Sequence, residues 1–260
     1  MPTVQSNGCA IHYEVEGAAD KPALMLCNSL GCTMQMWDGQ MPQLLQHFRV
    51  VRYDRRGHGK SDVPSGAYTM EMLGRDALAV LDAANVHKTH WCGLSMGGMV
   101  GMWMGANAPE RINKLILSNT SAYFENKQMW NDRIALVKDK GMQALVQGTL
   151  ERWFTKDFRE HEPKKVKVIG DMFLATKPDG FIGCGSAVRD MDHRPLLPKI
   201  KAQTLVIAGK QDAGTTVEMA EAIRKAVPGA SMTLFDAAHI ANVECQHDYT
   251  DAVLGFLLQR

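Results

Sequence analysis

The stretch that decides the fold is Trp91-Cys92-Gly93-Leu94-Ser95-Met96-Gly97-Gly98-Met99. It places a single hydroxyl, that of Ser95, among glycines and apolar residues. The pattern predicts a buried strand over 89–92 and a helix over 99–108 that ends near Pro109. A serine at a sharp turn between a strand and a helix, in the spacing Gly-x-Ser-x-Gly, is typical of a nucleophile elbow.

Small residues are needed on both sides of such a serine. A side chain at Gly93 or Gly97 would crowd the neighbouring strand or helix, because the turn is sharp and its backbone is strained. The helix that follows Ser95 offers free N–H groups and the positive end of its dipole, which stabilise negative charge on an oxygen. We therefore predict a nucleophilic hydroxyl; the alternative is an ordinary glycine-rich turn, which joins strands to helices in many folds.

Short apolar runs on either side of this motif predict the rest of a sheet. Helical patterns over 69–84 and 217–227 lie between them, so we expect an α/β fold, a mostly parallel central sheet with helices on both faces. An antiparallel hairpin over 3–16, turning at Asn7-Gly8, is expected at the sheet edge. The runs are 23–27, 50–53, 89–92, 115–117 and 204–208.

The alternation of strands and helices stops between about residues 121 and 194. This region is rich in helix formers, with amphipathic segments over 129–140 and 142–154 that Gly141 separates, and it offers no convincing strand. We predict a core domain of residues 1–121 and 195–260 and an inserted helical cap of residues 122–194. The cap is expected over the carboxyl edge of the sheet, where open α/β sheets bind ligands.

A nucleophilic serine needs a base, and the base needs an acid that orients it. Along chains with this elbow the order is serine, acid, histidine. Asp212 follows the run 204–209, and His239 follows the last predicted strand, 232–238, so both places are filled. Asp236 is a rival acid but lies within that last strand. His58 is a rival histidine, in a glycine-rich segment that is better explained as a rigid turn.

Two backbone N–H groups, those of Leu30 and Met96, are the candidates for an oxyanion hole. Met96 follows the serine directly, and Leu30 lies in the loop Asn28-Ser29-Leu30-Gly31-Cys32 after an early central strand. Together they are placed to bind the oxygen of a tetrahedral intermediate.

Composition excludes several other classes of function. Twenty-nine Lys and Arg nearly balance twenty-eight Asp and Glu, which removes the electrostatic argument for a nucleic acid or an anionic membrane as partner. No leader and no membrane-length apolar run is recognisable. The six cysteines form no Cys-x-x-Cys pair, which favours free thiols in a reducing cytoplasm over disulfides, zinc or Cys-His chemistry. We expect a cytoplasmic protein with a small-molecule partner; its oligomeric state, including a homo-oligomer, stays open.

With these residues located, the whole chain resembles the α/β-hydrolase superfamily, and in particular the 3-oxoadipate enol-lactonases of aromatic catabolism. The widespread pieces are Arg56-Gly57-His58-Gly59 and Gly93-x-Ser95-x-Gly97-Gly98. The narrower ones are Asn28-Ser29-Leu30-Gly31, Glu151-Arg152-Trp153-Phe154-Thr155 and Arg189-Asp190-Met191-Asp192. The chain departs from the superfamily after Asp212, where relatives usually have a proline-containing turn and this chain has Ala213-Gly214-Thr215-Thr216.

The resemblance implies an enzyme that opens 3-oxoadipate enol-lactone to 3-oxoadipate in the β-ketoadipate pathway. It implies no metal and no organic cofactor. Since such a lactone carries a carboxylate, the cavity should offer a cation. Trp130 and Arg133 share one face of the helix predicted over 129–140, and we expect them to form a cavity wall and the carboxylate partner. The alternative is cap packing with a solvated guanidinium.

Other functions fit the same residues. An esterase for small neutral esters or a carbon–carbon bond hydrolase would use the same three side chains, and only the cap and its charge would separate these enzymes. A non-catalytic receptor that holds a ligand in the same cavity is a further alternative, which the complete set Ser95, Asp212 and His239 argues against.

Overall fold

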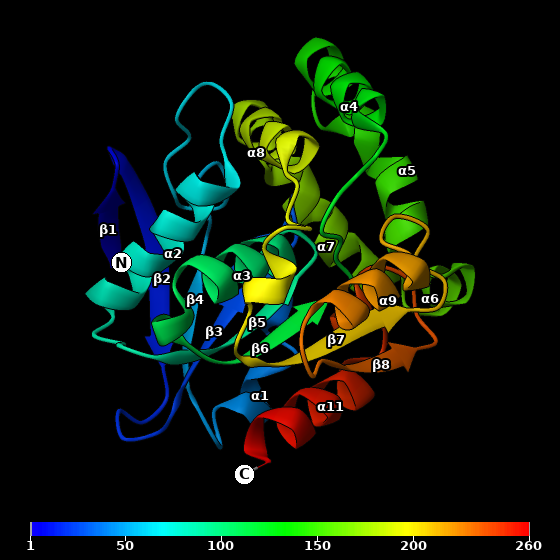
Figure 1. The fold of residues 1–260 in the computed structure, drawn as a ribbon. Helices are drawn as coiled ribbons and strands as arrows, with labels where there is room; N and C mark the ends of the chain where they lie inside the picture. Colours follow the sequence, from blue (N-terminus) through cyan, green and yellow to red (C-terminus); the bar gives the residue numbers. More distant parts are fainter. Residues whose placement is uncertain (1, 260) are drawn as a thin grey trace.

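The computed structural model describes residues 2–259, which form one twisted sheet of eight strands covered by helices (Figure 1). The strand order is β1-β2-β4-β3-β5-β6-β7-β8. β2 pairs antiparallel with β1 and β4, and the other neighbours pair in parallel. The strands are β1 (Thr3–Ser6), β2 (Cys9–Glu16), β3 (Ala23–Cys27), β4 (Arg49–Tyr53), β5 (Thr89–Leu94), β6 (Ile112–Ser118), β7 (Gln203–Gly209) and β8 (Ser231–Phe235).

The predicted fold class is confirmed, and the hairpin at the edge is formed by β1 and β2. Its turn residues, Asn7 at φ 48° and Gly8 at φ 74°, both adopt the left-handed backbone that a two-residue hairpin requires. The expectation for the last strand was wrong at its end, because β8 stops at Phe235 rather than 238. The carbonyls of residues 237 and 238 pack against Gly209 there, so the chain leaves the sheet. Asp236 therefore lies outside the strand and is exposed.

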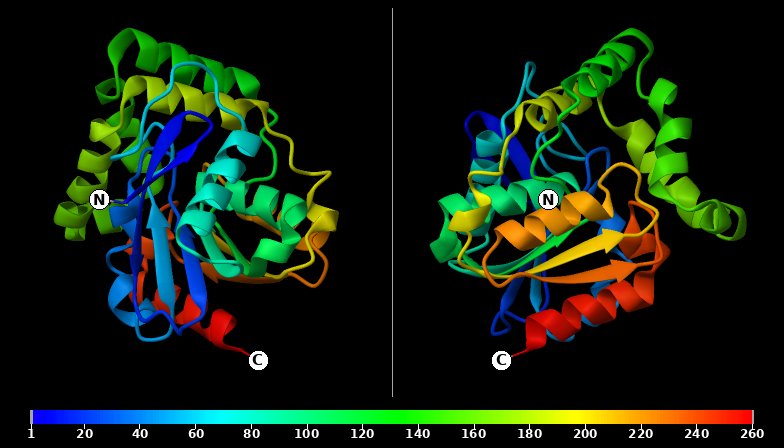
Figure 2. Two further views of the ribbon diagram at one scale, coloured as in Figure 1. Left: turned by 90° about the vertical axis from the view of Figure 1, so that its left-hand side faces the viewer. Right: turned by 45° about the vertical axis from the view of Figure 1, so that its right-hand side comes forward.

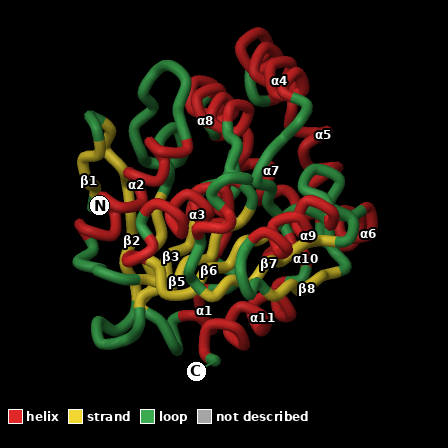
Figure 3. Tube along the Cα trace, in the orientation of Figure 1, coloured by secondary structure: helices red, strands yellow, loops and turns green. Residues whose placement is uncertain are grey.

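Helices cover both faces of the sheet, as expected from the alternating pattern (Figures 1 and 3). On one face lie α2 (Met70–Ala83), α3 (Met96–Asn107) and α9 (Val217–Ala226), and on the other lie α1 (Met41–Leu44) and α11 (Gln246–Leu258). Short helices occur at η1 (Met34–Trp37), η2 (Pro109–Arg111), η3 (Leu197–Lys199) and α10 (Ala241–Glu244). None of the helices within residues 2–259 has the length and apolar character needed to cross a lipid bilayer.

Five α-helices lie between β6 and β7, beyond the carboxyl ends of the parallel strands (Figure 2). Residues 119–202, which connect these two strands, contain no strand of the sheet. The segment leaves and rejoins the sheet at one place: Tyr123 pairs with Asp192 in an isolated antiparallel bridge, and the His193 N–H donates to the Ala122 carbonyl at 2.8 Å. The helices are α4 (Lys127–Lys140), α5 (Gln143–Trp153), α6 (Lys156–His161), α7 (Pro163–Ala175) and α8 (Pro178–Asp190).

Helices α7 and α8 pack closely on loops at the end of the sheet, and glycines make this close packing possible. A Cβ on Gly180, in the first turn of α8, would lie 2.0 Å from the Gly57 carbonyl oxygen, so the two backbones touch. A Cβ on Gly31 would lie 2.5 Å from the ring of Phe173 in α7. This close fit holds α7 against the loop that contains Gly31 and α8 against the loop that contains Gly57.

We predict that Gly180→Ala lowers the free energy of unfolding by about 1–3 kcal/mol, because the methyl group must displace backbone atoms rather than a flexible side chain. Gly255→Ala is the matched control. It lies inside α11 with no atom within 4 Å of an added Cβ, so it should be neutral or slightly stabilising. Urea unfolding of both variants measures the difference. Equal urea midpoints for the two variants would show that the Gly180–Gly57 contact accommodates a methyl group.

Candidate active site

Ser95 occupies a strained turn between β5 and α3. Its backbone has φ 57° and ψ −116°, and the helix begins at the next residue, three positions earlier than expected. The Ser95 N–H donates to the Ser118 carbonyl at 2.8 Å, and the Ser95 carbonyl accepts from the Thr120 hydroxyl at 2.7 Å. These bonds to the end of β6 fix a conformation that a serine rarely adopts.

The glycines around Ser95 are required by the packing, as the sequence predicts. A Cβ on Gly93 would lie 2.1 Å from the Gly97 carbonyl oxygen, and one on Gly97 would lie 2.0 Å from the Cys27 carbonyl oxygen. The start of α3 therefore sits directly against β5 and the end of β3. Only glycine allows backbones to approach this closely.

A cavity of about 360 Å³ opens in front of this turn, between the carboxyl end of the sheet and helices α4, α5, α7 and α8. The structure brings all the predicted site residues to this one cavity. Its lining includes Ser95, Asp212, His239, Leu30, Met96, Trp130 and Arg133.

Asp212 and His239, 27 residues apart in the chain, form a buried pair. His239 Nδ1 lies 2.7 Å from Asp212 Oδ2. Thr215, which the sequence analysis did not single out, joins both side chains: its hydroxyl donates to Asp212 Oδ2 at 2.6 Å and lies 3.2 Å from His239 Nδ1. The other carboxylate oxygen accepts the N–H groups of Gly214 and Thr215, each at 2.9 Å. The turn without proline thus still holds the carboxylate against the histidine.

Asn119 is a second residue that sequence reasoning missed. Its side-chain amide donates to Asp212 Oδ2 at 3.3 Å and to the Ala238 carbonyl at 3.1 Å, so it ties together the two loops that carry the acid and the histidine. Burial by itself raises the pKa of Asp212, but the charge of His239 and the bonds from His239 and Thr215 outweigh burial and lower that pKa to about 2. Asp212 is therefore ionised at neutral pH.

The imidazole of His239 is positioned by the end of α5. Its ring stacks on Trp153 with 6.0 Å between the ring centres, and its backbone N–H donates to the Trp153 carbonyl at 3.1 Å. Glu244 adds a second link: one carboxylate oxygen accepts from the Ala238 N–H at 2.9 Å, and the other accepts from the N–H and hydroxyl of Thr155. Neither His239 Nε2 nor Ser95 Oγ forms a hydrogen bond within residues 2–259, so both remain available to a ligand.

In the loop that carries Leu30, the N–H groups of Ser29, Gly31 and Cys32 all have acceptors. Ser29 donates to Met36 Sδ at 3.3 Å, Gly31 to His58 Nε2 at 2.9 Å and Cys32 to the Ser29 carbonyl at 3.2 Å. The N–H of Leu30 has no acceptor in the described chain, and neither has that of Met96 in the first turn of α3. Both residues line the cavity. Two residues with a free N–H therefore line the same cavity as Ser95.

His58, the rival histidine, lies apart from this constellation. It is fully buried, and burial together with the charge of Arg55 lowers its pKa to about 3, so it is a neutral acceptor for the Gly31 N–H. Asp236, the rival acid, accepts from the Gln211 side chain at 2.9 Å and does not line the cavity. His58 therefore fixes the loop that contains Gly31, and Asp236 fixes the loop that contains Gln211.

The far wall of the cavity offers donors without acceptors. The guanidinium of Arg133 lies over the Trp130 ring, 4.8 Å from its centre. Trp130 Nε1 and Arg133 Nε are buried and have no hydrogen-bond partner within the described residues. Burial and the nearby charge of Arg152 lower the pKa of Arg133 to about 10, which still leaves it cationic at neutral pH. Arg152, a further lining residue that the sequence does not assign to this wall, is exposed.

Nothing in residues 2–259 groups three or more His, Cys, Asp or Glu side chains as metal ligands. The chemistry that the described residues offer is that of an alcohol, an imidazole paired with a carboxylate, two free N–H groups and two guanidinium groups.

We predict that Thr215→Val raises the pKa of Asp212, because the carboxylate loses its hydroxyl donor. A carboxyl whose pKa is lowered by folding stabilises the fold above its ordinary value of 3.8, and this contribution, roughly 2 kcal/mol here, is lost as the pH falls toward 2. The variant should therefore lose less unfolding free energy than the wild type between about pH 5 and pH 2. Thr215→Ser keeps the hydroxyl and should follow the wild type. The same pH slope in all three proteins would contradict this role.

Comparison with known proteins places this site in a family. The family model described as alpha/beta hydrolase fold matches residues 22–244. The chain is 36% identical over 251 residues to 3-oxoadipate enol-lactonase 2 of Acinetobacter baylyi, a match that covers 96% of this chain and 94% of the relative. It is 32% identical over 250 residues to 3-oxoadipate enol-lactonase 1 of the same organism, with the same coverage.

Solved structures agree with the sequence comparison. The crystal structure of the enol-lactonase from Burkholderia xenovorans superposes with a TM-score of 0.97 at 38% identity, covering 99% of this chain and 100% of that one. The similarity spans the sheet and the inserted helices alike. The chain therefore belongs to the α/β-hydrolase fold family, and it is a carboxylic ester hydrolase similar to the enol-lactonases.

Proposed function

We propose that this protein is a serine hydrolase that opens the ring of 3-oxoadipate enol-lactone and yields 3-oxoadipate. The observation that carries the proposal is the content of one cavity, which is lined by Ser95, the Asp212–His239 pair and Arg133; Arg133 has no carboxylate partner within residues 2–259. An ester carbonyl and a carboxylate are the two groups of this lactone, and each has a complementary set of side chains here. In the β-ketoadipate pathway of aromatic catabolism the reaction would supply the open-chain acid.

Ring opening begins with attack of Ser95 Oγ on the lactone carbonyl carbon. His239 Nε2 takes the hydroxyl proton, while Asp212 keeps Nδ1 protonated and stabilises the imidazolium. The N–H groups of Leu30 and Met96 bind the oxygen that becomes negative. The carbon–oxygen bond of the ring then breaks, and the electrons go to the enol oxygen, which is a better leaving group than a simple alkoxide.

The second half of the reaction releases the acid. The departing enolate takes a proton from His239, and the acyl group remains on Ser95. A water molecule, deprotonated by His239, attacks the acyl carbon, and the second tetrahedral intermediate collapses to free Ser95 and a new carboxylate. The enol then converts to the ketone without further help from the protein. Each proton that His239 takes is returned, so the enzyme ends as it began.

Recognition of the substrate carboxylate falls to Arg133 and Trp130. Arg133 is half-buried and its Nε has no partner within the described residues, so it gains more from a carboxylate than a fully solvated cation does, because part of its water shell has already been removed. Trp130 Nε1 is unpaired beside it and can donate to the second oxygen. We further propose that residues 122–194 act as a cap, whose helices α4 and α5 supply these donors and shield the acyl-enzyme from bulk water.

We expect Ser95→Ala to reduce the turnover of enol-lactone, generated in situ and followed by its ultraviolet absorbance, by at least roughly 1000-fold. A serine-directed fluorophosphonate should label the wild type and leave the variant unlabelled. An unlabelled wild type would favour a ligand receptor instead of an enzyme. Equal turnover by both proteins would remove Ser95 from the reaction.

Arg133→Ala should raise KM for the anionic lactone by about 10- to 100-fold, the range expected for a lost charge-assisted hydrogen bond, and leave KM for a neutral ester within about threefold. Lys138→Ala is the control, since it removes a positive charge from the same helix outside the cavity. An equal loss on both substrates would exclude Arg133 as the carboxylate partner and favour a general esterase.

A further inference from the structure

Arg55 is a buried cation without an anion. Only 2% of its surface is exposed. One terminal nitrogen, Nη2, donates to the Asn28 carbonyl and lies 3.8 Å from Cys27 Sγ, whereas Nε and Nη1 have no partner. Across residues 2–259, no carboxylate oxygen lies within 4.0 Å of this guanidinium. The next residue differs sharply: Arg56 forms two bonds of 2.6 Å to Asp76.

An unpaired charge in the interior is expensive to bury. Transfer of an ion out of water costs several kcal/mol even after relaxation, and an apolar side chain of similar size at the same place usually gives a more stable protein. Fold stability therefore gives no account of Arg55. An explanation has to come from the groups that its charge acts on.

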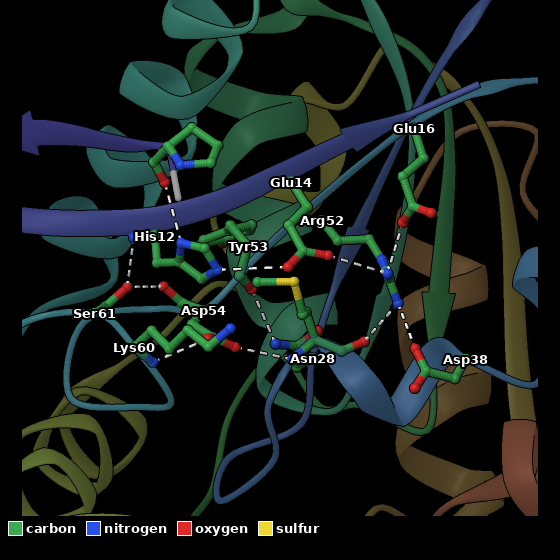
Figure 4. Close-up of polar contacts among 12 residues, drawn as sticks. His12, Glu14, Glu16, Asn28, Asp38, Arg52, Tyr53, Asp54, Lys60 and Ser61 are labelled. Atoms are coloured by element: carbon green, nitrogen blue, oxygen red, sulfur yellow. Dashed lines mark hydrogen bonds and ion pairs between the residues drawn. The ribbon is translucent and has the colours of Figure 1, made fainter. Parts of the chain in front are cut away.

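Those groups belong to the loop 28–32, which carries the free N–H of Leu30. The side chain of Asn28 accepts from Trp37 Nε1 at 3.0 Å and donates to the Tyr53 carbonyl at 3.0 Å. Figure 4 shows the second of these bonds. The backbone carbonyl of Asn28 accepts from Arg55. At the other end of the loop, the Gly31 N–H donates to His58. Arg55 and His58, which lie in a single turn, thus bind the loop on both sides of Ser29 and Leu30. Arg55 binds the carbonyl of Asn28, and His58 binds the N–H of Gly31.

The acceptor role of His58 depends on its remaining neutral. Protonated imidazole has a hydrogen on both nitrogens and could not accept the Gly31 N–H at Nε2. Burial lowers the pKa of His58, and the charge of Arg55 lowers it further. Arg55 therefore acts on the loop at both ends, directly at Asn28 and through His58 at Gly31.

We propose that Arg55 is a positioning residue for the oxyanion hole: its unpaired charge orients the loop 28–32 through the Asn28 carbonyl and stabilises the negative oxygen that forms beside the Leu30 N–H. The inference rests on the proposed role of that N–H. A neutral ester carbonyl interacts weakly with such a charge, whereas a tetrahedral oxyanion in a site shielded from water interacts strongly. The contribution is then made in the transition state and appears in kcat rather than in KM.

The test is Arg55→Met, assayed with the neutral substrate 4-nitrophenyl acetate. We expect kcat to fall about 10-fold with KM within about threefold, and Tm to rise because a buried unpaired charge is removed. Affinity for a boronic acid, which forms a tetrahedral anionic adduct on Ser95, should fall by the same factor as kcat. Affinity for acetate, a planar product anion, should change little. Arg55→Lys keeps a charge and should retain more activity than the methionine variant.

Arg56→Met is the matched control. It removes a neighbouring buried arginine that is paired, so it should lower Tm by leaving Asp76 without its partner. For Arg55→Met, an unchanged kcat and boronate affinity would overturn the proposal. A fall in Tm together with kcat would show a purely structural residue and would overturn it as well. If the methionine variant does not fold, Arg55→Gln makes the same comparison.

The neutral substrate separates this inference from the proposed function. Wild-type protein that hydrolyses 4-nitrophenyl acetate but not the enol-lactone would contradict the proposed substrate, and the effect of Arg55 on kcat would still decide the role of Arg55.

Discussion

The site depends on backbone contact between the start of α3 and the strands beneath it. Gly97 lies against the carbonyl of Cys27, and Gly93 lies against the carbonyl of Gly97, so no Cβ fits at either position. This contact forces the chain to reverse within one residue, and that residue is Ser95. The reversal places Ser95 and Met96, whose N–H has no acceptor in the described chain, side by side in the lining of the cavity. A looser turn would separate the two groups.

Charged groups in this molecule fall into two kinds. Some form ion pairs that hold the scaffold: Arg52 on β4 binds Glu14 at 3.3 Å, Glu16 at 2.7 Å and Asp38 at 2.6 Å (Figure 4). Others form no ion pair within the described residues: Arg55 is buried, Arg133 is half-buried, and both have buried nitrogen atoms without a hydrogen-bond partner there. Because an unpaired buried charge lowers stability, its presence in the cavity wall or against a cavity loop is a sign of interactions that form only with a ligand.

The inserted helices do more than cover the cavity. The last carbonyl of α5, that of Trp153, accepts the N–H of His239, and Glu244 links the same loop to Thr155. The histidine is thus positioned by the insertion as much as by the sheet. On the other side, Gly180 packs against Gly57, and Phe173 packs against Gly31 in the loop of Leu30. Movement of these helices would therefore displace His239 and the loop 28–32 together.

The amino-acid sequence by itself determined the fold class, the position of Ser95 and the chain order of the acid and the histidine. Those features rest on local patterns, because strand length, helical spacing and a glycine-flanked turn are set by neighbouring residues. The tertiary structure decided what depends on contacts between distant segments. Thr215 and Asn119 acquire their meaning only when the ends of β6, β7 and β8 meet at Asp212, and Arg55 is unpaired only because no acidic side chain folds against it. A pattern along the chain records which groups are present, whereas burial and pairing are properties of the folded core.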